Sequence, residues 1–273
     1  MSNYKIKVMD TEKSKIPLRK SMKEGVIAKF PSSVMVSGRS GSGKTNLLMN
    51  LLTDNGLYGN FFHCIIVYSP TAGQFDDTYK ILGIPKENFI EEFDQESLET
   101  LIESRKELIK KKGIEWVSKN CRVAIILDDI IANRKFLESQ VALKLFCLLR
   151  HYLCSIFVLV QSYTKLPRAL RLNCNSVYVF PCSQSEVERL IDEVTPAGMK
   201  KRSFEKVIDY CTNDQYSFLS INNHAKKGER IRKNLDEIIK LGDKRWETKS
   251  SDEKEKKLSS FSLDINKEED DFN

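Results

Sequence analysis

Residues 38–45 read GRSGSGKT, a full match to the pattern G-x-x-x-x-G-K-S/T. The apolar stretch Ser33–Ser37 precedes the motif, and Lys44–Leu52, which has helical character, follows it. Glycines let the backbone curl so that successive N–H groups point at phosphate oxygens, and a helix that begins at the loop adds its positive N-terminal dipole. The sequence therefore predicts a strand–loop–helix unit that binds the phosphates of a nucleotide.

The positions of this loop have different expected roles. Lys44 is expected to reach the β- and γ-phosphates, and the Thr45 hydroxyl is expected to hold Mg²⁺. The predicted nucleotide-binding residues are Gly38, Arg39, Ser40, Gly41, Ser42, Gly43, Lys44 and Thr45.

A second motif is an apolar stretch, Val123–Leu127, that ends in Asp128 and Asp129. In a protein with a phosphate-binding loop, the first acid at such a strand end holds the metal, so Asp128 is the predicted Mg²⁺ ligand. The second acid can orient and deprotonate the water that attacks the γ-phosphate, which makes Asp129 the predicted catalytic acid. An adjacent acid of this kind favours a motor-type ATPase over a small-molecule kinase. A GTPase is disfavoured because no Asn-Lys-x-Asp motif follows a strand.

Polar and basic residues follow the next predicted strand, Ile156–Gln161. Gln161 ends that strand, where it would sense the γ-phosphate or position the water. Arg168 and Arg171 lie three residues apart on one face of a short helix, and either one is a candidate arginine finger that completes a neighbouring subunit's site. Arg150 is a third candidate. The same arginines also fit a solvated basic face or a surface that contacts nucleic-acid phosphates.

The rest of the chain alternates apolar stretches with amphipathic ones, which predicts an α/β fold with a parallel sheet flanked by helices. Further strands are expected at Cys64–Tyr68, Phe89–Phe93 and Ser176–Phe180. Further helices are expected at Gln95–Lys112, with Asp94 as N-cap, and at Arg134–Tyr152, Ser185–Glu193, Met199–Cys211 and Glu229–Leu241. We expect a basic N-terminal arm at residues 1–29, one P-loop ATPase motor domain at 30–245, and a disordered charged tail at 246–273.

Composition limits the class of protein and suggests a partner. The 273 residues include 44 Lys and Arg against 38 Asp and Glu, a net charge of +6. Residues 249–273 carry 5 basic and 8 acidic side chains, so the other 248 residues carry a net charge of +9, which suits a polyanion partner. Most of the seven cysteines lie in apolar stretches, which indicates reduced core residues rather than disulfides or a zinc site. We expect no signal peptide and no membrane-spanning segment.

In their order along the chain, these motifs resemble those of the genome-packaging ATPases of large DNA viruses and virophages, within the FtsK–HerA superfamily of DNA-pumping motors. The resemblance is strongest to the poxvirus-type packaging ATPase and its virophage relatives, and it extends from Lys23 to Asn223. It rests on residues 38–45, Asp128-Asp129, Arg150-His151, Val160-Gln161-Ser162 and residues 167–174, PRALRLNC.

The resemblance implies a P-loop NTPase of the additional-strand, RecA-like type, with ATP and Mg²⁺ as cofactors. It implies a homo-oligomeric ring that hydrolyses ATP at its subunit interfaces and threads double-stranded DNA into a preformed capsid. Capsid proteins would be further partners, and the protein would work in the virion or in a virus factory of the host cytoplasm. By motif match, Lys44 and Thr45 carry over to nucleotide and Mg²⁺ binding, Asp128 to the metal, Asp129 to the catalytic acid and Gln161 to the sensor. The finger maps to Arg168 or Arg171, and Asp129 departs from the Glu of many cellular members.

We therefore expect an ATP-hydrolysing DNA translocase that packages a viral genome. Contacts to DNA phosphates carry no sequence information, which suits a motor that must move any genome. Candidate DNA-facing clusters are Lys110-Lys111-Lys112, Lys200-Lys201-Arg202 and Lys226-Lys227. The alternative function is a nucleotide-gated DNA-binding or scaffold subunit with little turnover.

Overall fold

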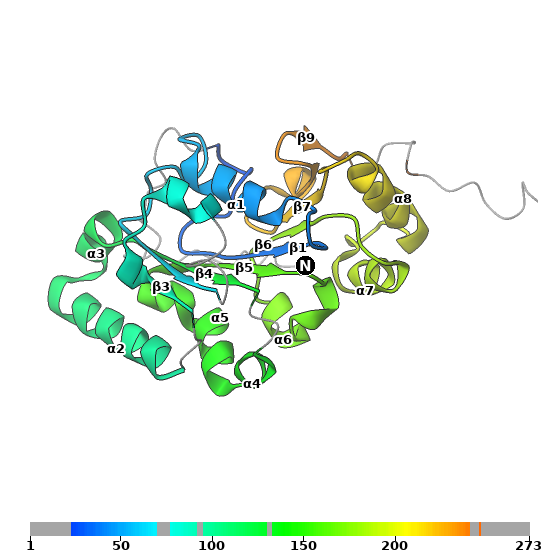
Figure 1. The fold of residues 1–273 in the computed structure, drawn as a ribbon. Helices are drawn as coiled ribbons and strands as arrows, with labels where there is room; N and C mark the ends of the chain where they lie inside the picture. The colour runs from blue at the N-terminus through cyan, green and yellow to red at the C-terminus, as the bar shows by residue number, and fades with distance from the viewer. Residues whose placement is uncertain (1–22, 70–76, 92–94, 130–132, 241–245, 247–273) are drawn as a thin grey trace, which may run out of the picture.

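The computed structural model describes residues 23–69, 77–91, 95–129, 133–240 and 246. These residues form a nine-stranded sheet with the strand order β3-β2-β4-β5-β1-β6-β7-β8-β9 (Figure 1). The strands are β1 Ser33–Ser37, β2 Cys64–Tyr68, β3 Phe89–Ile90, β4 Val123–Asp128, β5 Cys154–Val160, β6 Ser176–Val179, β7 Leu219–Asn222, β8 Ile231–Lys233 and β9 Glu237–Ile238.

The sheet is parallel from β3 to β6 and antiparallel from β6 to β9. Strand β5 lies between β1, which leads into the phosphate-binding loop, and β4, which ends in the acidic pair. This inserted strand defines the additional-strand arrangement, so the predicted fold class is confirmed. The predicted ranges match β1 and β2 residue for residue, and those of β4, β5 and β6 within two residues at each end.

Helices cover both faces of the sheet. In Figure 1, α1 lies above the sheet, and α2, α4, α5 and α6 lie below it. The helices are α1 Lys44–Thr53, α2 Gln95–Lys112, α3 Ile114–Asn120, α4 Arg134–Leu137, α5 Gln140–Tyr152, α6 Arg168–Arg171, α7 Gln184–Val194 and α8 Lys201–Thr212. Short 3₁₀ turns are η2 Asp77–Leu82, η3 Lys86–Asn88, η5 Tyr163–Lys165 and η6 Lys227–Glu229.

The central strands are mostly apolar because both of their faces are buried, and even the serines of β1, β5 and β6 are buried. On β4, Ile125 and Leu127 belong to the core between the sheet and α5. Ala124 and Ile126 belong to the core between the sheet and α1. Successive side chains of a strand point to opposite faces, so a strand between two helical layers favours apolar residues on both faces. The two cores hold the loop ends of β1, β4 and β5 in place.

The expected helix Arg134–Tyr152 is two helices, α4 and α5. Asn133 caps α4 by accepting a hydrogen bond from the Phe136 N–H at 3.0 Å. The Ser139 hydroxyl accepts the Ala142 N–H at 3.1 Å, so it satisfies one of the free donors at the start of α5. The capping serine thus starts a second helix inside one apolar stretch.

The expected helix Glu229–Leu241 is wrong, because its described residues, 229–240, begin at the end of η6 and form the antiparallel strands β8 and β9. Ile231 and Ile239 are buried in the core, but they reach it from β8 and from the residue after β9 rather than from a helix. Asn234 has a φ of 55°, which a right-handed helix cannot include. Strand β7, which the sequence did not predict, pairs with β6 on one side and β8 on the other, so it recruits this segment into the sheet.

Both ends of the described chain contact the domain. Three residues of the predicted arm are buried: Val26, Ile27 and Ala28. Val26 and Ile27 belong to the core on the α1 side of the sheet. Trp246, at the start of the predicted tail, is buried and its indole N–H donates to the Lys240 carbonyl at 3.1 Å. Asp94, the expected N-cap of α2, and most of the predicted arm and tail lie outside the described residues.

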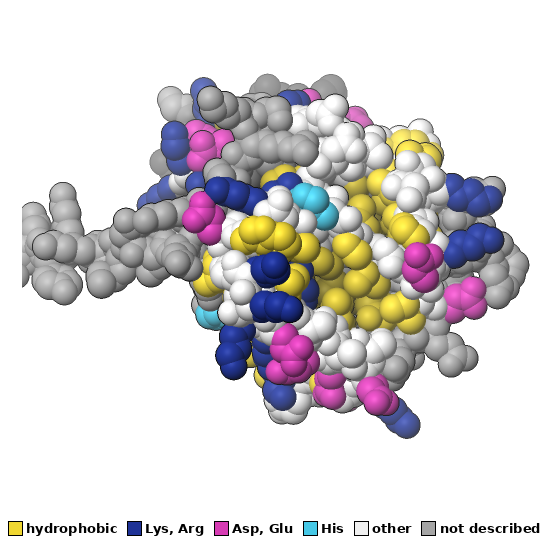
Figure 2. Space-filling model, turned by 90° about the vertical axis from the view of Figure 1, so that its left-hand side faces the viewer, with side chains coloured by type: hydrophobic (Ala, Val, Ile, Leu, Met, Phe, Trp, Pro, Cys, Tyr) yellow, Lys and Arg dark blue, Asp and Glu magenta, His cyan; other side chains and the backbone are white. Residues whose placement is uncertain are grey.

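The face at the β3 end of the sheet carries apolar side chains among Lys and Arg (Figure 2). Elsewhere on the described surface, large exposed apolar side chains are few, and Tyr216 and Leu172 are among them. Within the described part of the chain, no helix combines the length and the apolar character that crossing a bilayer requires.

Candidate active site

The three motifs meet at one edge of the sheet. Strands β1, β5 and β4 are neighbours, and their register aligns Ser37 with Val160 and Leu159 with Asp128. The Gly38 N–H donates to the Val160 carbonyl at 3.0 Å, which holds the start of the phosphate-binding loop beside the end of β5. Ligands of open α/β sheets bind at the carboxyl ends of the strands, and this edge is such a position.

The loop has the backbone that its glycines allow. Gly43 precedes α1 with a φ of 102°, and Gly41 has a φ of 74° with nothing within 4 Å of an added Cβ. At Gly38, an added Cβ would lie 2.7 Å from the Cβ of Phe180. The loop therefore curls tightly against the sheet and leaves its outer face open, the shape that N–H groups need to surround an anion.

A cavity of about 640 Å³ opens over the loop. Its volume falls within the range of about 300–1,000 Å³ that is usual for small-molecule sites. Its walls bring together most of the loop, both acids and Gln161. The lining residues are Ser40, Gly41, Gly43, Lys44, Thr45, Asn46, Leu47, Asn50, Thr78, Asp128, Asp129, Leu159, Gln161, Phe180, Tyr216 and Phe218.

Lys44 is a cation in the cavity wall that interacts with both acids. Its Nζ donates to the Arg39 carbonyl at 3.0 Å, so the side chain lies back across the loop. Burial lowers the pKa of Lys44, and the carboxylates of Asp128 and Asp129 oppose that shift. A partly desolvated ammonium group beside two acids is ready to exchange its carbonyl contact for phosphate oxygens.

Asp128 has a partner that the sequence did not reveal. The hydroxyl of Tyr79, a buried residue of η2, donates to Asp128 Oδ2 at 2.7 Å. This contact orients the carboxylate at the end of β4 and joins two segments that are 49 residues apart. Tyr79 lies in no recognisable motif, so only the fold brings it to the site.

Asp129 and Gln161 meet across neighbouring strand ends. Gln161 Nε2 donates to Asp129 Oδ1 at 2.9 Å. Asp129 has a φ of 51°, the left-handed region that Asp tolerates better than most residues, and this turn follows directly after β4. The amide and the carboxylate thus form one polar pair that faces the cavity.

The two candidate finger arginines occupy different environments on α6. The Arg171 side chain is only 6% exposed and pairs with Glu193, with Nη2 2.6 Å from Oε1 and Nε 3.0 Å from Oε2. Its guanidinium also lies over the Tyr163 ring, 4.9 Å from the centroid. The Arg168 side chain is 69% exposed and lies 3.6 Å from the same carboxylate. Arg171 is therefore held inside the domain, which counts against the prediction that it serves as a finger, whereas Arg168 is accessible.

The donor set fits a nucleotide with Mg²⁺. The open glycine loop fits phosphates, and a hydroxyl from Thr45 and a carboxylate from Asp128, both in the cavity wall, are the hard oxygen ligands that Mg²⁺ prefers. Segments without a sequence motif supply four further residues that line or support the cavity: Tyr79, Phe180, Tyr216 and Phe218.

Comparison with known families agrees with this geometry. Residues 20–243 match the family model described as "Poxvirus A32 protein". The chain belongs to this family. The matched range includes the phosphate-binding loop, the acidic pair, Gln161 and both α6 arginines.

Relatives of this A32 family chain occur in large DNA viruses. The chain is 25% identical over 199 residues to uncharacterized protein 075L of Invertebrate iridescent virus 6, covering 71% of this chain and 72% of the relative. It is 27% identical over 177 residues to DNA packaging protein OPG160 of Vaccinia virus, covering 64% of this chain and 62% of the relative.

Solved structures share the fold. The crystal structure of B204, the DNA-packaging ATPase of Sulfolobus turreted icosahedral virus, superposes with a TM-score of 0.53 at 16% identity, covering 75% of this chain and 98% of that one. The genome packaging NTPase B204 of Sulfolobus turreted icosahedral virus 2 in complex with AMP gives a TM-score of 0.52 at 13% identity, covering 77% and 98%. The A32 family chain therefore has the fold of viral genome-packaging NTPases.

Proposed function

We propose that this chain is an ATP-hydrolysing translocase that packages a viral genome as double-stranded DNA into a capsid. The observation that carries the proposal is the contact between Gln161 Nε2 and Asp129 Oδ1 at 2.9 Å, beside the phosphate-binding loop. A carboxylate and an amide on neighbouring strand ends are suited to hold and activate a water against the γ-phosphate. Membership of the poxvirus A32 family and the relative named a DNA packaging protein support the same function.

ATP and Mg²⁺ are the proposed cofactors. The loop from Gly38 to Thr45 surrounds the phosphates, and Lys44 binds the β- and γ-phosphates once its ammonium leaves the Arg39 carbonyl. Thr45 and Asp128 would hold the Mg²⁺, which would supply positive charge beside the phosphates. The Tyr79 hydroxyl fixes the Asp128 carboxylate for that task.

Hydrolysis depends on Asp129 and Gln161 as a unit. Asp129 accepts the proton of the attacking water, and Gln161 orients Asp129 and detects whether the γ-phosphate is present. This gives the motor a residue through which β4 and β5 report the state of the nucleotide.

We infer that the working unit is a homo-oligomeric ring in which Arg168 is the finger. Its exposed guanidinium can reach a neighbouring subunit, whereas Arg171 is engaged with Glu193. Leu172, four residues after Arg168, is an apolar side chain that is 52% exposed, which fits a subunit interface beside the finger. Stabilising transition-state charge from a second subunit would couple hydrolysis to ring motion.

DNA is the proposed substrate of the motor, and the basic clusters are its proposed contacts. Lys110-Lys111-Lys112 end α2, Lys200-Lys201-Arg202 begin α8, and Lys226-Lys227 begin the η6 turn. Lys201 already pairs with Asp192 at 2.6 Å, so its neighbours are better placed for phosphates. Capsid proteins are further proposed partners, in the virion or the virus factory.

An ATPase assay with and without duplex DNA tests the function. Wild-type protein is expected to hydrolyse ATP faster when double-stranded DNA is added, and Lys44→Ala and Asp129→Asn are expected to lose nearly all turnover. Asp129→Asn should still bind ATP, because the loop and Asp128 are intact. Asp209→Asn is the matched control, since Asp209 is exposed on α8 and outside the cavity wall.

The result separates the motor from the scaffold alternative. Slow turnover that does not respond to DNA, from a folded oligomer that binds ATP, would favour the nucleotide-gated scaffold. Mixing Arg168→Ala subunits with Lys44→Ala subunits tests the finger, because some mixed interfaces then hold an intact loop and an intact arginine. If no activity returns in these mixtures, Arg168 does not act on a neighbour.

A further inference from the structure

One wall of the cavity is aromatic, and no motif accounts for it. Tyr216 lies between α8 and β7, lines the cavity and is 60% exposed. In the same cavity wall, the rings of Phe180 and Phe218 pack with centroids 5.1 Å apart. A Cβ added to Gly43 would lie 3.4 Å from Tyr216 Cδ1 and 3.6 Å from Phe180 Cε1. The tyrosine ring therefore stands against the end of the phosphate-binding loop.

The backbone at Tyr216 is held in a costly conformation. Its φ is 64°, in the left-handed region that bulky residues avoid. On the strand side of it, Ser217 closes the turn: its hydroxyl donates to the Asp214 carbonyl at 2.8 Å, and its N–H donates to the same carbonyl at 3.1 Å. These hydrogen bonds hold the backbone of the turn that carries Tyr216, and contacts from a neighbouring strand reinforce it.

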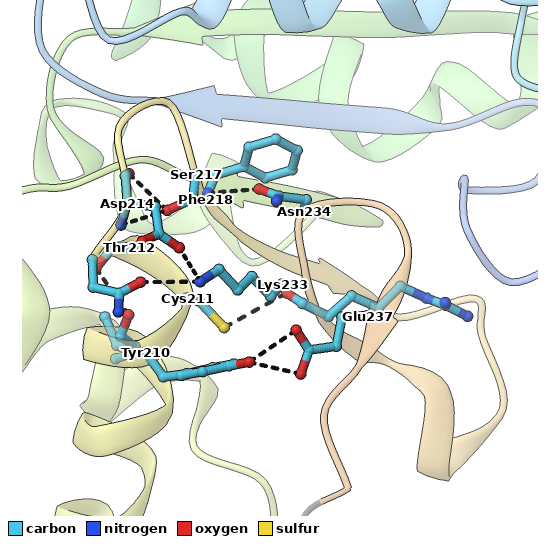
Figure 3. A network of polar contacts seen from close by, with 12 residues as sticks. Tyr210, Cys211, Thr212, Asp214, Ser217, Phe218, Lys233, Asn234 and Glu237 are labelled. Atoms are coloured by element: carbon cyan, nitrogen blue, oxygen red, sulfur yellow. Dashed lines mark hydrogen bonds and ion pairs between the residues drawn. The ribbon is translucent and has the colours of Figure 1, made fainter.

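Those contacts come from the β8 strand and the turn after it (Figure 3). Lys233 Nζ donates to Asn213 Oδ1 at 3.0 Å and also pairs with the Asp214 carboxylate. The Asn234 side chain accepts the Phe218 N–H at 3.1 Å, and its own N–H donates to the Phe218 carbonyl at 2.9 Å. The antiparallel end of the sheet thus braces both sides of the loop that presents Tyr216.

We propose that the Tyr216 ring is the stacking platform for the base of the bound nucleotide, a purine if the substrate is ATP. The phosphate-binding loop and the two acids serve the charged, phosphate-bearing part of a nucleotide. The base needs a flat apolar surface instead, and Tyr216, Phe180 and Phe218 supply one at this wall. Every nucleobase offers a π-face to such a ring, so stacking adds affinity without a charged partner. The inference rests on nucleotide binding at the site proposed above.

Binding measurements on two variants and two ligands test this role. Tyr216→Asn removes the ring but keeps a residue that tolerates the positive φ, and Tyr216→Phe is the control that keeps the ring. Calorimetry is run with a non-hydrolysable ATP analogue and with inorganic tripolyphosphate, both with Mg²⁺. Thermal unfolding of both variants shows whether the loop stays folded.

We expect Tyr216→Asn to weaken binding of the ATP analogue about 5- to 150-fold, the range for losing one base–aromatic stack. Tyr216→Phe should bind like wild type, and tripolyphosphate, which has no base, should bind all three proteins equally. Unchanged affinity of Tyr216→Asn for the analogue would overturn the inference, as would an equal loss for both ligands, which indicates a structural role.

A third variant separates this inference from the proposed function. If Lys44→Ala loses both ligands while Tyr216→Asn loses neither, the nucleotide site stands and the stacking role fails. If wild-type protein binds neither ligand, the proposed function fails and the stacking role fails with it.

Discussion

Replacing Arg171 with alanine would leave a carboxylate buried without its cation. The Arg171 and Glu193 side chains are 6% and 4% exposed, and two hydrogen bonds of 2.6 and 3.0 Å join them. Breaking a buried ion pair by removing one partner costs about 3–5 kcal/mol, because the remaining charge stays desolvated. For a domain of this size each kcal/mol lowers Tm by about 2–4 °C, so Arg171→Ala should lose about 6–20 °C.

Two further variants make the assay specific. Arg168→Ala removes a side chain that is 69% exposed and 3.6 Å from Glu193, so it should cost at most about 1 kcal/mol. In the double variant Arg171→Met, Glu193→Gln no charge is buried, and the oxygen of the new side-chain amide would still accept the Tyr163 hydroxyl. That double variant should therefore regain much of the stability that Arg171→Ala loses.

Thermal and urea unfolding measure these differences. A Tm for Arg171→Ala within about 2 °C of wild type would refute the reasoning, since the pair would then contribute little to folding. The ATPase of each variant is measured well below its Tm. Under those conditions Arg168→Ala should be stable but should lose ATP turnover if Arg168 is the finger. Arg171→Ala should keep the ATP turnover of its folded fraction.

Three further results are expected. Tyr79→Phe removes the donor 2.7 Å from Asp128 Oδ2, so the Mg²⁺ concentration for half-maximal turnover should rise about 10- to 100-fold, measured by titrating Mg²⁺ at fixed ATP. Gly38→Ala should abolish nucleotide binding in calorimetry, because its Cβ would lie 2.7 Å from the Phe180 Cβ and displace the loop. Burial raises the pKa of Glu193, but hydrogen bonds from its arginine and tyrosine partners outweigh this and lower the pKa below 4.5. Its contribution to stability is present above pH 4.5 and is lost as the pH falls through the lowered pKa, so Tm between pH 6 and 3 should fall less steeply in Glu193→Gln.

Much of the fold was predictable because its signals are local. A strand between two helical layers is mostly apolar, and short Val- and Ile-rich stretches located β1, β2, β4, β5 and β6 within two residues. The phosphate-binding loop needs glycines at set positions, so its eight residues were recognisable together with the strand and helix around it. The acidic pair and Gln161 were likewise recognisable as residues at the ends of predicted strands, whereas the pairing of those strands came from the structure.

The wrong prediction of a helix at residues 229–241 and the unpredicted aromatic wall share a non-local cause. Residues 229–241 have apolar residues at helical spacing, yet Ile231 and Ile239 reach the core from β8 and from the residue after β9. Strand β7 offers β8 an antiparallel edge, and hydrogen bonding to that edge outweighs a marginal local preference. Contacts from β8 and the turn after it also hold the loop that carries Tyr216. The aromatic wall of the cavity could therefore not be predicted without those strands.

By itself, the sequence determined the chemistry that the chain can offer: a phosphate loop, two acids and a glutamine, each recognisable from neighbours within a few residues. Only the tertiary structure decided which side chains share that site or are withheld from it. Tyr79 joins Asp128 across 49 residues, and burial against Glu193 separates Arg171 from the otherwise similar Arg168. The physical reason is that backbone conformation follows from local chemistry, whereas burial and side-chain contact are properties of surfaces that exist only once distant segments pack together.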